Sequence, residues 1–343
     1  MRITFILAAV FVFAACGTEM ERVSLQKRFD AAVRPADIHE AVLYIENSSG
    51  DFSESFGYGG RDIDTPMLTA SVGKLFTTAC VLILYQEGRL SLEDKLSLHF
   101  EEEQLRGLHV FKGREYSFNL TVYDLLFQTS GLPAGSGSLA DEDKYVGFAQ
   151  RLAETKTFAP KFVPKAGAYY ANINFFMLGE ILEKVTGMSL TDVYEKMVFM
   201  PLGMADSYLI TCESDYIPYF YNGTEKLYRP QRLASVWATG GFVSTPRDLM
   251  VFSKGFWEGR LFDRALLEKL AVYRKLKPYF GPVHYGGGFM QIPLIGGGEL
   301  LGHSGVTGSF AFYYPQEDLH FVGDFSQLKK PAAPFGMLMR LSR

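Results

Sequence analysis

The chain has 343 residues, of which 48% are hydrophobic, so it can bury a sizeable core. Its formal net charge is -4 and it shows no basic stripe, which argues against a nucleic acid as partner. No group of cysteines and histidines has zinc-site spacing and no G-x-x-x-x-G-K-[ST] motif occurs, so we expect neither a metal nor another cofactor.

The N-terminus has the pattern of an export signal. A minimal charged start is followed by an almost wholly apolar run over residues 3–15, too short to span a bilayer comfortably. Small residues then precede Cys16, as in a bacterial lipobox. We expect a lipoprotein signal peptide over residues 1–15, lipid attachment at Cys16 and a tether over residues 16–28. The alternative is an ordinary cleaved signal in which Cys16 is incidental.

The periodicity of the remaining chain predicts an α+β fold. Residues 41–58 have the pattern of a β-hairpin, and residues 300–325 that of further strands separated by turns. From about residue 96 to 228 the chain reads mostly as helical segments and loops. We therefore predict an antiparallel sheet built from both chain ends, flanked by helices, with an inserted helical lobe. Residues 29–343 would form a single bilobed domain with its cleft between the lobes.

Ser71 and Lys74 form an S-x-x-K pair at the start of a predicted helix. A serine in a first turn has a backbone N–H without an intrahelical partner, at the positive end of the helix dipole. That supplies half of an oxyanion hole. Lys74 shares a helix face with Ser71 and can approach its hydroxyl. The same spacing recurs at Ser24 and Ser326, but neither serine stands at such a helix start.

A serine hydroxyl needs a nearby base, and two residues could provide it. Lys74 could serve if burial lowers its pKa. Tyr170, in the motif Tyr170-Ala171-Asn172, could serve if a neighbouring cation favours its phenolate. The plainer alternative is that Tyr170 is a packed aromatic and Asn172 merely an N-cap of the following helix.

The third motif is His303-Ser304-Gly305, which follows a glycine-rich turn. It is expected on a strand whose exposed edge could pair with a substrate amide, with the Val306 N–H as the second oxyanion donor. The alternative is that His303, beside glycines, is only structural.

These motifs lie within longer stretches that resemble one family, the penicillin-recognising serine hydrolases. This group comprises class C β-lactamases, D-alanyl-D-alanine carboxypeptidases and related esterases. The resemblance runs from about residue 41 to 325 and implies a β-lactamase/transpeptidase-like fold. The stretches that carry it are Met67 to Thr77, Glu87 to Asp94, Leu125 to Pro133, Pro201 to Met204 and Gly240 to Leu249.

The resemblance implies a role for each motif residue. Ser71 would be the acylated nucleophile, Lys74 its proton-handling neighbour, and Tyr170 the general base in acylation and the water-activating group in deacylation. The residues that would bind substrate are Asn172, His303, Ser304, Gly305 and Val306.

The chain departs from the family's pattern at three places. His303 stands where many relatives carry a lysine, and a histidine is mostly neutral at pH 7. Gly73 replaces a usual threonine and is expected to loosen the helix slightly, because glycine is a poor helix former. Gln128 stands where a histidine often precedes Thr-Ser-Gly. Neither Gly73 nor Gln128 removes a reacting group, whereas His303 makes binding of a substrate carboxylate less secure and weakens the case for strong β-lactam turnover.

The resulting hypothesis is a membrane-tethered serine hydrolase that forms an acyl-enzyme on Ser71. Its partner would be a small-molecule or peptide acyl substrate, namely a β-lactam, a D-Ala-D-Ala peptide or a carboxylic ester. We expect a monomer in the bacterial cell envelope, with a lipid anchor as its only membrane contact. The alternative is a weak or inactive penicillin-binding-like protein that binds a cell-wall peptide.

Overall fold

The computed structural model describes residues 23–35, 37–278, 281–294 and 297–341. In this part of the chain, nine strands form one sheet, in the order β2-β1-β16-β15-β14-β13-β12-β11-β6. Their bounds are β1 Ala41–Asn47, β2 Ser53–Tyr58, β6 Ala168–Tyr169, β11 Arg274–Lys277, β12 His284–Tyr285, β13 Met290–Pro293, β14 Glu299–Ser304, β15 Phe310–Tyr314 and β16 Leu319–Asp324. Because β1 pairs with β16, the two chain ends meet in the sheet, which confirms the predicted α+β class.

The predicted hairpin is confirmed over β1 and β2. Its turn is closed by the Asn47 side chain, whose Oδ1 accepts the Phe52 N–H at 3.1 Å. β1 is buried at its first five positions, on both faces of the sheet. A strand covered on both faces reads as a continuous apolar run, which explains the sequence Ala-Val-Leu-Tyr-Ile.

One strand departs from the predicted antiparallel sheet. β6 comes from the middle of the chain and runs parallel to β11, with Ala168 opposite Leu276. The pairing continues one residue further, where the Tyr170 N–H donates to the Lys277 carbonyl at 2.8 Å. This added strand holds Tyr170 at the edge of the sheet.

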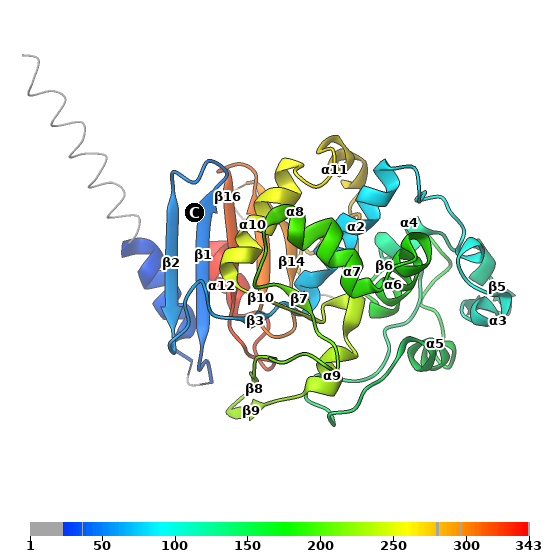
Figure 1. The fold of residues 1–343 in the computed structure, drawn as a ribbon, viewed down its shortest axis with the longest axis horizontal. Coiled ribbons are helices and arrows are strands. Elements are labelled where there is room, and N and C mark those ends of the chain that lie inside the picture. Colours follow the sequence, from blue (N-terminus) through cyan, green and yellow to red (C-terminus); the bar gives the residue numbers. More distant parts are fainter. Residues whose placement is uncertain (1–22, 36, 279–280, 295–296, 342–343) are drawn as a thin grey trace, which may run out of the picture.

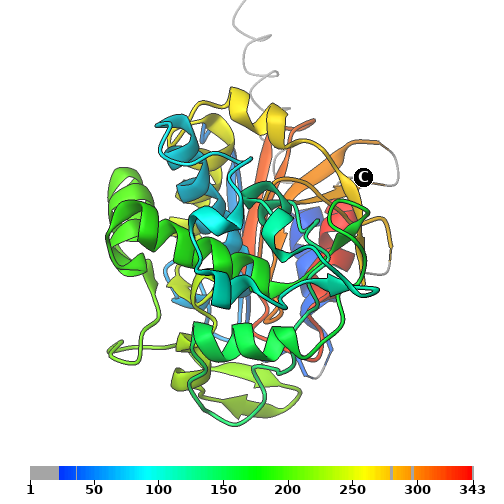
Figure 2. The ribbon, with the colours of Figure 1, turned by 90° about the vertical axis from the view of Figure 1, so that its right-hand side faces the viewer.

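Helices cover both faces of the sheet (Figures 1 and 2). α2 and α10 lie on one face, and residues 23–33, which are helical, lie with α12 on the other. Phe29 of this first helix is buried against the rings of Phe56 and Phe325. Residues 23–28 of the expected tether lie in this helix, and residues 16–22 lie outside the described residues. The expected signal peptide and Cys16 lie outside the described residues.

The remaining helices form most of the central part of the chain (Figure 1). In the described residues, no helix has both the length and the apolar character needed to cross a membrane. The bounds of the named α-helices are α2 Lys74–Gln86, α3 Glu102–Leu105, α4 Val122–Leu126, α5 Phe148–Lys156, α6 Asn172–Thr186, α7 Leu190–Tyr194, α8 Met200–Leu202, α9 Pro230–Ala234, α10 Pro246–Glu258, α11 Ala265–Leu270 and α12 Ala333–Leu341.

α2 is the central helix, and its side chains are buried almost all the way round. Such a helix is hydrophobic on every face because every face meets protein. Phe76 illustrates this, since its ring packs edge-on against Phe242 at 5.0 Å and against Phe252 at 4.5 Å between centroids.

A small sheet leads the chain into α2. It has the order β3-β10-β7, with β3 Met67–Leu68, β10 Phe242–Ser244 and β7 Tyr208–Leu209. A 3-10 turn, Ala70–Gly73, joins β3 to α2. Two short hairpins complete the described strands, namely β4 Val110–Phe111 with β5 Arg114–Glu115, and β8 Phe220–Asn222 with β9 Glu225–Leu227.

Candidate active site

Ser71 lies in the 3-10 turn just before α2, rather than in the first turn of the α-helix. The chain is held firmly ahead of it at Thr69. The Thr69 N–H donates to the Phe242 carbonyl at 3.0 Å, and its own carbonyl accepts the Ser309 hydroxyl at 2.6 Å. Ala70 then adopts a φ of 44°, a left-handed value uncommon outside glycine. The corner formed in this way presents Ser71 to a cavity.

Lys74, the first residue of α2, is completely buried beside Ser71. Its Nζ donates to Ser71 Oγ at 3.2 Å. Two further acceptors hold the same nitrogen, Asn172 Oδ1 at 2.9 Å and the Thr239 carbonyl at 2.7 Å. Burial lowers the pKa of Lys74 well below its usual range, because the ammonium form loses its hydration. A neutral amine keeps two hydrogens, which suffice for the Asn172 and Thr239 oxygens, and its lone pair can then accept the proton of the Ser71 hydroxyl.

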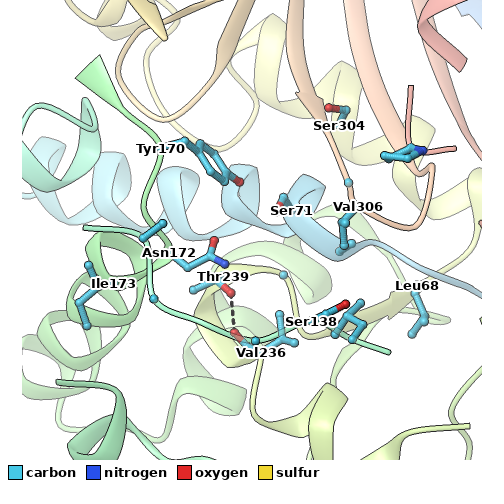
Figure 3. Close-up of a pocket in the computed structure, with 18 of the residues that line it drawn as sticks. Leu68, Ser71, Ser138, Tyr170, Asn172, Ile173, Val236, Thr239, Ser304 and Val306 are labelled. Carbon is cyan, nitrogen blue, oxygen red and sulfur yellow. Dashed lines mark hydrogen bonds between the residues drawn. The ribbon is translucent and has the colours of Figure 1, made fainter. Parts of the chain in front are cut away.

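Tyr170 lies beside the nucleophile (Figure 3). Its hydroxyl points toward Ser71, and Lys74 Nζ lies 5.1 Å from the centroid of its ring. The structure therefore brings together the three residues predicted to be catalytic. The phenol and the amine approach Ser71 from different elements.

Asn172 does not cap α6, as one interpretation of the sequence held. The helix begins at Asn172 itself, Ala171 occupies the N-cap position, and no side chain makes a capping hydrogen bond there. The Asn172 side chain instead points into the site and accepts the hydrogen bond from Lys74.

Gln128, one of the departures from the family's pattern, fixes the loop that carries Tyr170. Its backbone carbonyl accepts the Tyr169 N–H at 2.9 Å. Its side-chain Oε1 accepts the Ala171 N–H at 3.0 Å and the Asn174 amide at 2.5 Å. Gln128 thus bonds to the residues on both sides of Tyr170, so we regard it as a positioning residue.

β14 ends at Ser304, so Gly305 and Val306 lie just beyond the strand rather than on it. Gly305 approaches the nucleophile turn very closely, since a Cβ on it would lie 2.8 Å from the Cβ of Ala70. Only glycine allows this approach, which brings Val306 next to Ser71 (Figure 3).

The backbone amides of Ser71 and Val306 are suited to hold an oxyanion. Ser304, Gly305 and Val306 all line the cavity, together with Ser71. Within the described part of the chain, neither the Ser71 nor the Val306 N–H is engaged in a hydrogen bond. Two free donors beside a nucleophile are what a tetrahedral intermediate requires.

The His303 side chain does not line the cavity. It is completely buried. Its ring packs against Tyr170 and Tyr285, at 5.9 and 5.8 Å between centroids. Burial is the largest cause that lowers the pKa of His303, to about 3, so the ring is neutral. Tyr170, which packs against the His303 ring, does line the cavity.

The cavity has a volume of about 670 Å³ and extends from Ser71 in two directions. On one side, residues 134–139 and parts of α5 and α9 line it, including Arg151, Glu154 and Arg232. Figure 3 shows Ser138 and Val236 on this side of Ser71 and Ser304 on the other. Sequence reasoning missed these arginines, which carry no recognisable motif. Among the described residues, no group of His, Cys, Asp and Glu could hold a metal ion.

Comparisons with known proteins identify the family of the chain. A family model described as Beta-lactamase matches residues 45–336. Penicillin-binding protein 4* of Bacillus subtilis (strain 168) is 27% identical over 198 residues, which cover 54% of this chain and 41% of that relative. The chain thus spans less than half the length of this curated relative.

Two solved structures share the fold over most of the chain. A D-stereospecific amidohydrolase from Streptomyces sp. is 25% identical, with a TM-score of 0.76 and coverage of 89% of this chain and 94% of that one. The octameric penicillin-binding protein homologue from Pyrococcus abyssi is 23% identical, with a TM-score of 0.75 and coverage of 93% and 77%. The chain belongs to the Beta-lactamase family, whose members include serine hydrolases of the amidase and esterase type.

Proposed function

We propose that this chain is a serine hydrolase that forms an acyl-enzyme on Ser71 and hydrolyses an amide or an ester. The observation that carries the proposal is the hydrogen bond from Lys74 Nζ to Ser71 Oγ, made by a buried amine at the wall of a cavity. A buried lysine with a lowered pKa is a recognised way to activate a nucleophile.

In the proposed acylation step, the Ser71 Oγ attacks the substrate carbonyl while its proton passes to Lys74 Nζ or to the Tyr170 oxygen. The oxyanion is held by the N–H groups of Ser71 and Val306. The proton then moves to the leaving amine or alcohol as its bond to the carbonyl carbon breaks. A water molecule, deprotonated by the same groups, attacks the ester on Ser71 and restores the free hydroxyl.

An amide with a D-configured residue is the first substrate to test. The similar structure from Streptomyces is described as a D-stereospecific amidohydrolase, which supports that choice. A panel of nitrocefin, a D-Ala-D-Ala peptide, D- and L-amino acid amides and short-chain p-nitrophenyl esters separates the lactam, peptide, amide and ester alternatives.

The decisive experiment combines turnover with covalent labelling. Wild-type protein is expected to hydrolyse at least one member of the panel and to gain the mass of a fluorophosphonate adduct in intact-protein mass spectrometry. Ser71→Ala is expected to lose both. Ser326→Ala is the matched control, because Ser326 belongs to another S-x-x-K match and its hydroxyl bonds to the Tyr219 carbonyl, away from the site. Adduct formation without turnover of any substrate would instead indicate a binding protein.

We also propose that the protein is exported and anchored at the cell envelope through a lipid on Cys16. The support is the apolar run over residues 3–15 followed by small residues and the cysteine. In a bacterial host, the wild-type protein is expected in the detergent phase of a Triton X-114 partition and Cys16→Ala in the aqueous phase. Partition of both into the aqueous phase would exclude the anchor. A monomer also stays a prediction, which light scattering can test.

A further inference from the structure

The cavity has two branches that meet at Ser71. The first branch is the side lined by residues 134–139 and parts of α5 and α9, and the second branch lies on the Ser304 side. Four large apolar side chains from β13 and α12 line it, namely Met290, Ile292, Phe335 and Met339. The charged residues among those described as lining the cavity, Arg151, Glu154 and Arg232, all belong to the first branch.

A continuous series of contacts leads from the catalytic strand into this branch. The Ser304 hydroxyl contacts the Met290 sulfur at 3.8 Å. Met290 and Ile292 are two residues apart on β13, so they project from the same face of the sheet. Both are buried and form the floor of the branch.

A glycine of the sheet lies next to that floor. Gly302 of β14 is paired with Met290 on one side and with Phe312 on the other. Its φ of 154° favours glycine, and a Cβ there would lie 2.8 Å from the Cα of Phe312. The sheet therefore carries no side chain between these two large apolar residues.

α12 covers this part of the sheet. The Phe335 ring packs against Phe312 at 5.7 Å between centroids, and Phe335 and Met339 are one helical turn apart on the side that lines the cavity. Neighbouring Leu338 is instead buried in the protein core. Apolar side chains thus enclose the branch from both the sheet and the helix.

We infer that this second branch binds an apolar arm of the substrate, such as an alkyl or aromatic group attached to the reacting carbonyl or to its leaving group. The inference rests on the proposed function, because Ser71 at the junction of the branches determines what occupies them. A neutral apolar wall favours groups that leave water, whereas a charged group would lose its hydration there without a partner.

The test measures how the rate of reaction at Ser71 depends on the length of the probe's apolar chain. One series of p-nitrophenyl alkylphosphonates varies the alkyl chain, and one series of acetate esters varies the alcohol. In one of the two series, the second-order rate constant is expected to rise about three- to fourfold for each added methylene until the branch is full. The series that responds shows which arm of the substrate lies in the branch.

Variants of α12 separate the apolar branch from general effects on the fold. Phe335→Ala and Met339→Ala are expected to reduce the dependence on chain length, and Met339→Trp to shorten the longest chain accepted. Leu338→Ala on the same helix is expected to lower the melting temperature but to keep the chain-length dependence, which makes it the matched control.

Two failures are distinguishable. Equal rate constants at every chain length in both series, with Ser71 still labelled by the shortest probe, would overturn this inference alone. Absence of Ser71 labelling by every probe would overturn the proposed function and, with it, the inference.

Discussion

Lys74 Nζ and Ser71 Oγ lie 3.2 Å apart in a site where the lysine has no exposed surface. Three acceptors surround the nitrogen, yet none of them is a carboxylate. A buried amine held only by neutral oxygens gains little from being charged and loses its hydration, so its neutral form is favoured. This arrangement supports the proposed role of Lys74 as the base that activates Ser71.

The first prediction concerns this amine. Lys74→Met removes the base and is expected to lower kcat/KM by about 100-fold or more. Stability is expected to change little, because losing a buried amine is favourable whereas leaving the Asn172 and Thr239 oxygens without a donor costs about 1–3 kcal/mol each. Ester hydrolysis and urea denaturation measure the two effects. Near-normal activity in Lys74→Met, with an inactive Tyr170→Phe, would assign the proton transfer to the tyrosine alone.

The second prediction concerns the phenol of Tyr170. Tyr170→Phe keeps the ring that packs on His303 and Tyr285 and removes only the oxygen that points toward Ser71. We expect kcat to fall by about 100- to 10,000-fold with KM nearly unchanged.

Tyr285→Phe is the control for that experiment. Tyr285 is a neighbouring buried tyrosine whose hydroxyl lies 3.5 Å from His303 Nε2, and it does not line the cavity. The Tyr285→Phe variant is expected to retain most of the wild-type hydrolytic activity. Equal losses in the two variants would show that the ring cluster as a whole matters, rather than the Tyr170 hydroxyl.

The third prediction is a pH dependence that His303 gives to stability. Burial lowers the pKa of His303 to about 3 in the folded protein, whereas the unfolded chain has the ordinary value of 6.5. Between these values the unfolded state binds the additional proton, so the free energy of unfolding rises with pH and becomes level above about pH 6.5. From about pH 4.5 to about pH 6.5 the contribution is about 2 kcal/mol.

His303→Gln removes that proton and keeps a buried polar side chain. Urea denaturation across this pH range is expected to show a rise in stability that is smaller than in the wild type by about that amount. The same rise in both proteins would show that His303 is not the titrating group and that its burial has little effect on its pKa.

The sequence was sufficient to predict the elements whose pattern is local. The hairpin over residues 41–58 and the sheet shared by both chain ends followed from alternation and turn residues, and the helix after Ser71 followed from its apolar spacing. The juxtaposition of Ser71, Lys74 and Tyr170 was predicted from the order of three motifs and their family context, not from physical periodicity.

The contacts that complete the site could not be predicted, because they join residues far apart in the chain. Lys74 is held by a backbone carbonyl 165 positions away, at Thr239, and any residue offers such a carbonyl. Gln128 appeared only as a departure from a pattern, although its side chain fixes the loop around Tyr170. The burial of His303 depends on the rings of Tyr170 and Tyr285, which converge only in the folded protein.

Gly73 shows most clearly how a tertiary contact overrides a local rule. Helix propensity alone suggests that glycine weakens the turn after Ser71, so that alanine would be better by about 1 kcal/mol. In the structure, however, Gly73 faces the core, and a Cβ on it would lie 2.9 Å from the Cα of Gly240 and closer still to the ring of Phe242. The absence of a side chain permits this contact.

The fourth prediction follows from that contact. Gly73→Ala is expected to destabilise the protein by about 1–3 kcal/mol, because the gain in propensity is smaller than the cost of overpacking a buried aromatic cluster. Activity should fall as well, since Gly240 and Phe242 both lie against the chain that carries Ser71.

A double-mutant cycle identifies the cause. Phe242→Leu alone is expected to destabilise the protein, because the Phe242 ring packs against Phe76 and Tyr194 in the core. Combined with Gly73→Ala, it should cost less than the sum of the two single changes, because the shorter side chain leaves room for the new methyl group. Additive losses in denaturant unfolding would mean that the methyl group meets the Gly240 backbone instead. A more stable Gly73→Ala single variant would show that helix propensity, and not packing, decides at this position.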